Sequence, residues 1–214
     1  AESLGFILSS LSSGSKDSSD LPEVLVGRAN PKVALLIINS SDRGLCGGFN
    51  SSLFRSAVSW INEKKSKGIE VKLMPIGKKA SAFYKRSELE ILENFEDINT
   101  NERQLEVSDN VKNKISELFE SHAIDEVSIL YNKFVSAIAQ EPTYKSLIPL
   151  EQPSPEENTA ESNNSSFEFE PDKNELLEYL IPRNFMTQIY GSILESSAAE
   201  HAARMTSMDN ATRN

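Results

Sequence analysis

The sequence is poor in cysteine, histidine and positive charge, and each shortage argues against a class of protein. One cysteine in 214 residues cannot form an internal disulfide, which is typical of a protein from a reducing compartment. Two histidines and one cysteine cannot supply four nitrogen or sulfur ligands for a structural zinc ion. The 22 Lys and Arg residues face 32 Asp and Glu residues, and the resulting charge of −10 argues against nonspecific binding to nucleic acid or anionic lipid. A basic partner surface is more plausible.

Long apolar runs are also missing. No run approaches the roughly 20 residues that a membrane-spanning helix needs, and the N-terminus lacks the basic start and apolar core of a signal peptide. We therefore expect a soluble chain with no direct insertion into a membrane. Because it starts at Ala1 and stops directly after a helical pattern, we expect it to be a piece of a longer protein. The 38% of hydrophobic residues suffice for one core in which helices cover a sheet.

The rest of the chain is organised around a glycine-rich turn, Ser40–Asn50. The unbroken apolar run Val33–Ile38 before it is typical of a strand covered on both faces, as in the middle of a mostly parallel sheet. After the turn, apolar residues recur at helical spacing, with Asn50 placed as the N-cap and Gly68 placed to close the helix in a left-handed conformation. The turn therefore joins a buried strand to a helix.

The following segments predict an α/β fold. Val71–Ile76 reads as a strand parallel to the first, and Lys78–Arg86 as a short helix with Ala80, Phe83 and Tyr84 inward. Leu89–Ile98 is open between a strand and an irregular segment. A helix is expected from about Asn101, and a strand at Val127–Tyr131 that stays extended towards Pro142.

Residues 151–166 are acidic and polar and predict a flexible loop. Phe167 and Phe169 alternate with glutamates, as in an edge strand that closes a long hairpin around this loop. Together the patterns predict a three-layer α/β/α fold with a mixed, mostly parallel five-stranded sheet.

The C-terminal region predicts a short helix at Glu175–Leu180, an interruption at Pro182 and a long helix to the end of the chain. One stripe of this helix has the spacing of a helix that pairs with another helix. Its C-terminal half, Ala198–Met208, is lined with small and flexible side chains rather than Leu and Ile, which suggests a partner outside this chain.

Two kinds of chemistry could reside in the glycine-rich turn, and neither has a strong motif. A strand-to-helix turn can bind phosphate through backbone N–H groups, but Gly44, Gly47 and Gly48 do not give the G-x-G-x-x-G spacing, and Gly77-Lys78 lacks the rest of a P-loop. Cys46 could be a nucleophile with a lowered thiol pKa, or only a small apolar residue.

The remaining polar residues also lack a catalytic arrangement. His122 and His201, the possible bases for Cys46, lie on separate helical segments. Asp42 and Arg43 could be an acid and an anion clamp, a local hydrogen-bonded pair or an intermolecular contact. No pair of carboxylates has the spacing of a general acid and base.

The residues of the turn carry a family resemblance. The stretch Ser41–Asn50, SDRGLCGGFN, resembles the signature of the gamma subunit of F-type ATP synthases, the central rotor stalk. Three further stretches match in the family's order, so that the resemblance covers nearly the whole chain: Asp125–Phe134, Ser146–Leu150 and Glu200–Thr212.

The resemblance implies an α/β domain beside an antiparallel coiled coil of the N- and C-terminal helices. Residues 1–13 would end the N-terminal helix, residues 14–182 would form the α/β domain, and residues 183–214 would be a truncated C-terminal helix. The stripe Ala198–Met208 would face the missing N-terminal helix and the inner surface of the catalytic hexamer. Most of the coiled coil is absent, and residues 151–166 look longer and more acidic than the family needs.

The resemblance also implies function. The chain would be a non-catalytic rotor subunit without cofactor or metal, peripheral at the cytoplasmic face of the bacterial inner membrane or at the mitochondrial matrix face. Its partners would be the alpha and beta subunits, the epsilon subunit and the c-subunit ring. The subunit-interface residues would be Asp42, Arg43, Gly44, Leu45, Cys46, Gly47, Gly48, Phe49, Asn50, Ala203, Arg204, Met205, Met208, Ala211 and Thr212. A phosphate- or nucleotide-binding α/β enzyme and a free adaptor domain remain as alternatives.

Overall fold

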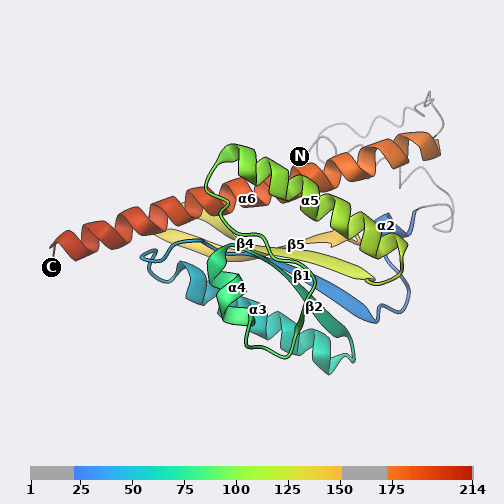
Figure 1. Cartoon of the computed structure of the whole chain (residues 1–214), viewed down its shortest axis with the longest axis horizontal. Helices are drawn as coiled ribbons and strands as arrows, with labels where there is room; N and C mark the ends of the chain where they lie inside the picture. Colours follow the sequence, from blue (N-terminus) through green and yellow to red (C-terminus); the bar gives the residue numbers. More distant parts are fainter. Residues whose placement is uncertain (1–21, 151–172, 214) are drawn as a thin grey trace, which may run out of the picture.

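The computed structural model describes residues 22–150 and 173–213 of the chain (Figure 1). The elements are, in chain order, helix α2 (Glu23–Val26), strand β1 (Val33–Asn39), helix α3 (Phe49–Ser66), strand β2 (Glu70–Ile76), helix α4 (Lys78–Tyr84), strand β3 (Glu90–Ile91), helix α5 (Asn101–Glu120), strands β4 (Glu126–Ser136) and β5 (Ala139–Ile148), and helix α6 (Lys173–Arg213).

The sheet has five strands in the order β3-β2-β1-β4-β5. Strand β1 is parallel to both β2 and β4, β2 is parallel to β3, and β5 alone runs antiparallel, beside β4. Residues Ala34–Asn39 of β1 are all buried, because this strand lies in the middle of the sheet with helices on both faces. The predicted mixed, mostly parallel five-stranded sheet is confirmed.

The antiparallel edge strand was not predicted where it occurs. The segment after Tyr131 does not simply stay extended: it turns back, and β5 pairs with β4 from Ala139 to Ile148. Polar and apolar residues do not alternate regularly in Ala139–Ile148, so the sequence gives little indication of a strand there. The hairpin predicted around residues 151–166, with its strand at Phe167 and Phe169, lies outside the described residues.

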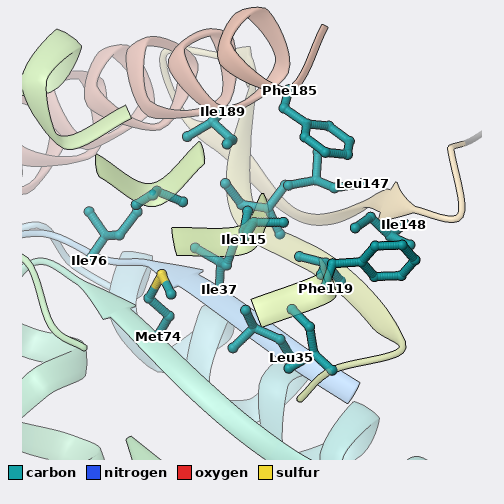
Figure 2. Packing of buried hydrophobic residues seen from close by; sticks show 14 of the residues in the cluster. Leu35, Ile37, Met74, Ile76, Ile115, Phe119, Leu147, Ile148, Phe185 and Ile189 are labelled. Carbon is teal, nitrogen blue, oxygen red and sulfur yellow. The ribbon is translucent and has the colours of Figure 1, made fainter. Parts of the chain in front are cut away.

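Two layers of helices complete the predicted α/β/α arrangement (Figure 1). Alternating residues of β1 belong to different cores, because successive side chains of a strand point to opposite faces. Leu36 and Ile38 pack with α3 and α4, whereas Leu35 and Ile37 pack with α5 and α6. Figure 2 shows the second core, in which Ile115 of α5 and Ile189 of α6 lie over the sheet.

Helix α6 is continuous, and the predicted interruption at Pro182 is wrong. It runs for 41 residues with Pro182 inside it. A proline removes one backbone hydrogen bond from a helix. Here, buried side chains before and after Pro182 hold the helix to the rest of the chain. They are Leu177 and Ile181 before it, and Phe185 and Ile189 after it. The C-terminal end extends past the sheet, as expected for a remnant of a helical coiled coil (Figure 1). The boundary at residues 182/183 stays a prediction, and residues 1–13 are not described.

Two local predictions are corrected, one short helix was not predicted, and one prediction is confirmed. Helix α3 begins at Phe49 with Gly48 as its N-cap, so Asn50 is not the cap. Phe83 is 50% exposed rather than inward, because Ala80 and Tyr84 already occupy the buried side of the short helix α4. Helix α2 was not predicted, because the sequence of residues 14–30 is polar and reads as a loop. Gly68 is left-handed after α3, with φ of 74°, as predicted.

The segment Leu89–Ile98, for which the sequence allowed either a strand or an irregular segment, contains both. It forms the two-residue strand β3 and an isolated bridge between Phe95 and Ile76, with irregular backbone between them.

Candidate functional site

The glycine-rich turn lies at the carboxyl end of β1, the central strand, where the chain leaves the sheet for α3 (Figure 1). Strand β1 pairs with β2 on one side and with β4 on the other, so the order of successive strands reverses direction at β1. In open α/β sheets this reversal of strand order marks the crevice in which ligands usually bind. The turn therefore sits where a nucleotide-binding protein would hold its ligand.

The Asp42 carboxylate occupies three backbone donors beside the turn. It accepts hydrogen bonds from the backbone N–H groups of Lys78 at 3.0 Å, Asp97 at 3.1 Å and Ile98 at 2.8 Å. These N–H groups could otherwise have faced a phosphate. Asp42 therefore ties the turn to the start of α4 and to the loop before α5, and it is not free to act as an acid.

Ser40 and Gly77 hold the turn against the next strand. The Ser40 hydroxyl accepts from the Ala80 N–H at 2.8 Å and donates to the Ile76 carbonyl at 3.1 Å. Gly77 has φ of 92°, and a Cβ atom placed on it would lie 2.3 Å from the Ser40 carbonyl oxygen. Only glycine fits this approach of two backbones.

Asn50 and Cys46 form a small polar network inside the turn. The Asn50 side chain accepts from the Ser41 N–H at 3.1 Å and donates to the Ser41 hydroxyl at 2.8 Å and to the Cys46 sulfur at 3.3 Å. Cys46 is 3% exposed, and its other partners are the Ser41 hydroxyl and the Arg43 carbonyl. None of these partners is a base, so the arrangement supports a structural role for the thiol.

The two histidines do not join this network. His122 lies after the end of α5, and His201 is exposed on α6. Within residues 22–150 and 173–213, no group of three or more His, Cys, Asp or Glu side chains is placed to hold a metal ion.

Helix α6 covers the turn with its small residues. Cys46 and Phe49 pack directly against Ala199 and Ala203. A Cβ atom on Gly47, whose φ is 56°, would lie 2.9 Å from the Ser207 hydroxyl oxygen. The predicted orientation of the stripe is therefore wrong for Ala199 and Ala203, which are small because the turn lies against them.

Hydrogen bonds from β1, from β4 and from the hairpin between β4 and β5 strengthen this packing. The Asn39 amide donates to the Ser192 carbonyl at 3.4 Å, and the Ser196 hydroxyl donates to the Asn39 carbonyl at 3.4 Å. The buried Asn132 amide of β4 donates to the Phe49 carbonyl at 3.0 Å. At the hairpin between β4 and β5, the Thr206 hydroxyl donates to the Ala137 carbonyl at 2.9 Å. Turn, sheet and helix thus form one connected unit.

The predicted interface residues divide by burial. Cys46, Phe49 and Ala203 are buried inside the chain. Asp42, Gly44, Asn50 and Arg204 are half-buried, and Arg204 pairs with Glu200. The others are exposed: Arg43, Leu45, Gly47, Gly48, Met205, Met208, Ala211 and Thr212. Burial within the chain does not test a contact with another subunit. The assignment of these residues to an interface therefore stays a prediction.

Leu45 is the most unusual of the exposed residues. It is 75% exposed and has φ of 62°, a left-handed conformation that non-glycine residues adopt at a cost. An apolar side chain held outward in a strained backbone is not explained by packing within the described residues. Strain of this kind clusters at functional sites.

The tip of the hairpin was missed by the sequence reasoning. Phe134, Val135 and Ile138 are exposed there by 43%, 57% and 82%, next to α6. The sequence could have indicated this exposed tip, because three large apolar residues in a short stretch break the alternation of polar and apolar residues in the strand.

A cavity of about 230 Å³ lies between the turn, the loop before α5 and α6. Its lining carries both signs of charge, from Asp42, Arg43, Glu200 and Arg204. The opposite charges and the pairing of Arg204 with Glu200 leave it without a clear preference for an anion.

Comparisons with known proteins agree with one another. A family model described as ATP synthase matches residues 1–214. The ATP synthase gamma chain of Pelagibacter ubique is 39% identical over 218 residues, which cover 100% of this chain and 73% of the relative. That of Paramagnetospirillum magneticum is 38% identical over 215 residues, with the same coverage of 100% and 73%.

Solved structures show the same fold. A chain in the central stalk and c-ring of the Tetrahymena thermophila mitochondrial ATP synthase matches with a TM-score of 0.64 and 21% identity, covering 99% of this chain and 98% of that one. A chain in the rotor of the Euglena gracilis enzyme matches with a TM-score of 0.56 and 16% identity, covering 98% and 83%. Among the described helices, none is long and apolar enough to cross a membrane.

Proposed function

The chain belongs to the ATP synthase gamma-chain family, and from this premise we propose that it is the rotor subunit of the central stalk, which couples rotation of the membrane ring to conformational change at the catalytic beta subunits. A rotor subunit breaks no bond itself. It acts through contacts that differ between the conformational states of the catalytic sites.

The attachment of α6 to the sheet is the observation that carries the proposal. A shaft transmits torque only if it cannot turn or slide relative to the domain that drives it. Side chains at regular helical intervals fix α6 to the rest of the chain, and all of them are buried: Phe185, Ile189, Ser192, Ile193, Ser196, Ala199 and Ala203. Close-packed interiors of this kind transmit strain.

The exposed residues of the turn and of the end of α6 are proposed to touch the catalytic hexamer. Arg43 and Leu45 project from the turn, and Met205 and Met208 from the helix. Methionine suits a contact that must be made and broken repeatedly, because its side chain is flexible and adapts to different surfaces. The buried residues Cys46, Phe49 and Ala203 would act by holding the turn in place.

The proposal includes partners and location. The chain would contact the alpha and beta subunits of the hexamer, the epsilon subunit and the c-subunit ring. It would be peripheral, at the cytoplasmic face of the bacterial inner membrane or the matrix face of the mitochondrial one. ATP would be made on other subunits, and this chain would need no cofactor.

Nucleotide binding at the turn is the competing hypothesis. It is weakened by Asp42, whose carboxylate already accepts three backbone N–H groups beside the turn. Isothermal titration of the full-length chain with ATP and ADP tests it directly, and micromolar binding would favour it over the rotor.

Reconstitution tests the proposed function. Purified alpha and beta subunits should form a stable complex that hydrolyses ATP at a high rate only when the full-length chain is added. Arg43→Ala in that chain should lower ATP-driven proton pumping or assembly, whereas Lys32→Ala, at an exposed cation elsewhere, should not. Two results would count against the proposal. One is a rate of ATP hydrolysis that does not change when the chain is added, and the other is equal proton pumping by the Arg43→Ala and Lys32→Ala variants.

A further inference from the structure

The segment before α5 supplies two of the donors that hold the Asp42 carboxylate. Asp97 has φ of 59°, a left-handed conformation that few non-glycine residues adopt. The consecutive N–H groups of Asp97 and Ile98 both donate to Asp42, at 3.1 and 2.8 Å. Successive N–H groups at such a bend form a concave anion-binding site, or nest. In this chain the Asp97–Ile98 nest is filled by the chain's own carboxylate, and the Lys78 N–H adds a third donor at 3.0 Å.

The nest is fixed to the body of the chain. Ile98 is buried in the core that contains residues of α5 and α6, and its carbonyl oxygen accepts a hydrogen bond from the Gln104 side chain at 3.1 Å. Three residues before Ile98, the Phe95 carbonyl accepts from the Gly77 N–H at 2.7 Å, directly after β2. A carboxylate that is bound to this nest is therefore held in place relative to both the sheet and α5.

The exposed part of the turn begins directly after Asp42. Arg43 and Leu45 are exposed, and Cys46 returns to the interior, where it packs against small residues of α6. The exposed stretch thus lies between two attachments, the Asp42 carboxylate before it and the buried Cys46 after it. Release of the carboxylate would detach the turn from the segment before α5, while the packing on α6 could stay in place.

We propose that Asp42 is a positioning residue of the rotor, and that its attachment to the Asp97–Ile98 nest sets the place of the exposed stretch that follows it. Asp42 itself does not contact the catalytic hexamer. The inference rests on the proposed function, in which Arg43 and Leu45 make that contact. It gives the segment before α5 a part in coupling, although that segment contributes no contact of its own.

A matched pair of variants at position 97 tests whether the nest holds the turn. Asp97→Val and Asp97→Gly both remove the ion pair with Lys78. Glycine adopts a positive φ freely, whereas a β-branched residue does so only as an outlier. The nest should therefore persist in Asp97→Gly and be lost in Asp97→Val. In the full-length chain, trypsin should cut after Arg43 faster in Asp97→Val than in Asp97→Gly. Cutting after Lys67, which also precedes a glycine, should be equal in the two variants.

Coupling in the assembled ATP synthase complex tests the role of Asp42 itself. With Asp42→Asn or Asp97→Val, the complex should still hydrolyse ATP but lose most of its ATP-driven proton pumping, because an amide has one acceptor oxygen fewer and valine displaces the donors. Asp97→Gly should keep the pumping. Asp125→Asn is the control for a merely structural role, because Asp125 also accepts backbone N–H bonds, from Lys32 and Val33 at the opposite end of β1. It should keep the pumping per ATP hydrolysed.

Three outcomes would overturn the inference. They are equal pumping per ATP by Asp42→Asn and Asp125→Asn, equal pumping by Asp97→Val and Asp97→Gly, and equal trypsin cutting after Arg43 in the Asp97 pair. If Asp42→Asn does not assemble, the Asp97 pair decides. The complex with the unchanged chain separates this test from that of the proposed function. If that complex does not pump, the proposed function fails; if it pumps and the variants do not differ, only the role of Asp42 fails.

Discussion

At the scale of single residues, glycine is used in this chain for two different reasons. Gly68 and Gly77 both have positive φ, of 74° and 92°. A Cβ atom on Gly68 would meet nothing within 4 Å, whereas one on Gly77 would lie 2.3 Å from the Ser40 carbonyl oxygen. The first glycine relieves only backbone strain. The second also permits the contact that fixes the turn.

Gly77→Ala should therefore be much more destabilising than Gly68→Ala. We expect the free energy of unfolding to fall by about 3 kcal/mol or more for Gly77→Ala, because overpacking adds to the strain. Gly68→Ala, the matched control, should cost about 1 kcal/mol. Urea unfolding followed by circular dichroism measures both, and equal losses would show that the close approach to Ser40 is unimportant.

Asp125 makes the stability depend on pH. Its burial raises the pKa of the carboxyl, but hydrogen bonds from Arg28 and from the N–H groups of Lys32 and Val33 outweigh this, and the folded-state pKa lies below the usual value. A lowered folded-state pKa gives stability that is present above the unfolded pKa of about 3.9. This stability is lost as the pH falls through the folded pKa.

Asp125→Asn should therefore remove part of the acid sensitivity. At pH 7 we expect it to lower the free energy of unfolding by about 1–3 kcal/mol, because hydrogen bonds to a charged group are lost. Below the folded pKa the two proteins should become similar in stability. Thermal unfolding from pH 7 down to pH 2 measures this, with Asp209→Asn, at an exposed ion pair of α6, as the control. A constant difference at every pH would contradict the assignment.

At the scale of elements, the small residues of α6 explain how a helix lies directly on a turn. Ala203 is 7% exposed and packs with Cys46 and Phe49, whereas Ala198 is exposed on the other side of the helix. A larger side chain at position 203 must displace the turn.

Ala203→Leu should destabilise the chain by about 1–3 kcal/mol through overpacking. In the assembled complex it should also lower the ATP-driven pumping per ATP hydrolysed, because the turn would be displaced. In the thermal unfolding of the chain alone, Ala198→Leu is the control of equal volume and should be close to neutral. If both variants unfold at the same temperature, and Ala203→Leu pumps as well as the unchanged chain, Ala203 does not set the position of the turn.

The same elements show what could be predicted from the sequence. Strand β1, helix α3 and their connection had strong patterns, because a strand buried on both faces is an unbroken apolar run and an amphipathic helix repeats its apolar residues with the helical period. Strand β5 and the unbroken α6 did not. The first is a half-exposed edge strand, and in the second tertiary packing overrides the local effect of Pro182.

The candidate site was located by sequence but not understood from it. The stretch Ser40–Asn50 could be singled out by its glycines and its family resemblance. Its partners could not, because Asp42 bonds to Lys78, Asp97 and Ile98, and Cys46 meets Ala199 and Ala203, all distant in the chain. Only folding brings these residues together.

At the scale of the whole molecule, the account holds that the turn, the sheet and α6 move as one rigid body. A rotor subunit with a flexible joint between its globular domain and its shaft would lose torque at the joint. The contact between Gly47 and Ser207 offers a way to test for such a joint, because it links the turn to the end of the helix.

The most direct measurement locks this contact with a disulfide. A Cβ atom on Gly47 would lie 2.9 Å from the Ser207 hydroxyl oxygen, close to the spacing of about 3 Å between a Cβ atom and the far sulfur of a disulfide. Gly47→Cys with Ser207→Cys is made in the full-length chain, in a Cys46→Ala background with any cysteine outside this fragment removed. ATP-driven proton pumping by the assembled complex is then compared before and after oxidation. A rigid turn and helix predict equal pumping in both states; pumping that stops on oxidation and returns on reduction would contradict the account.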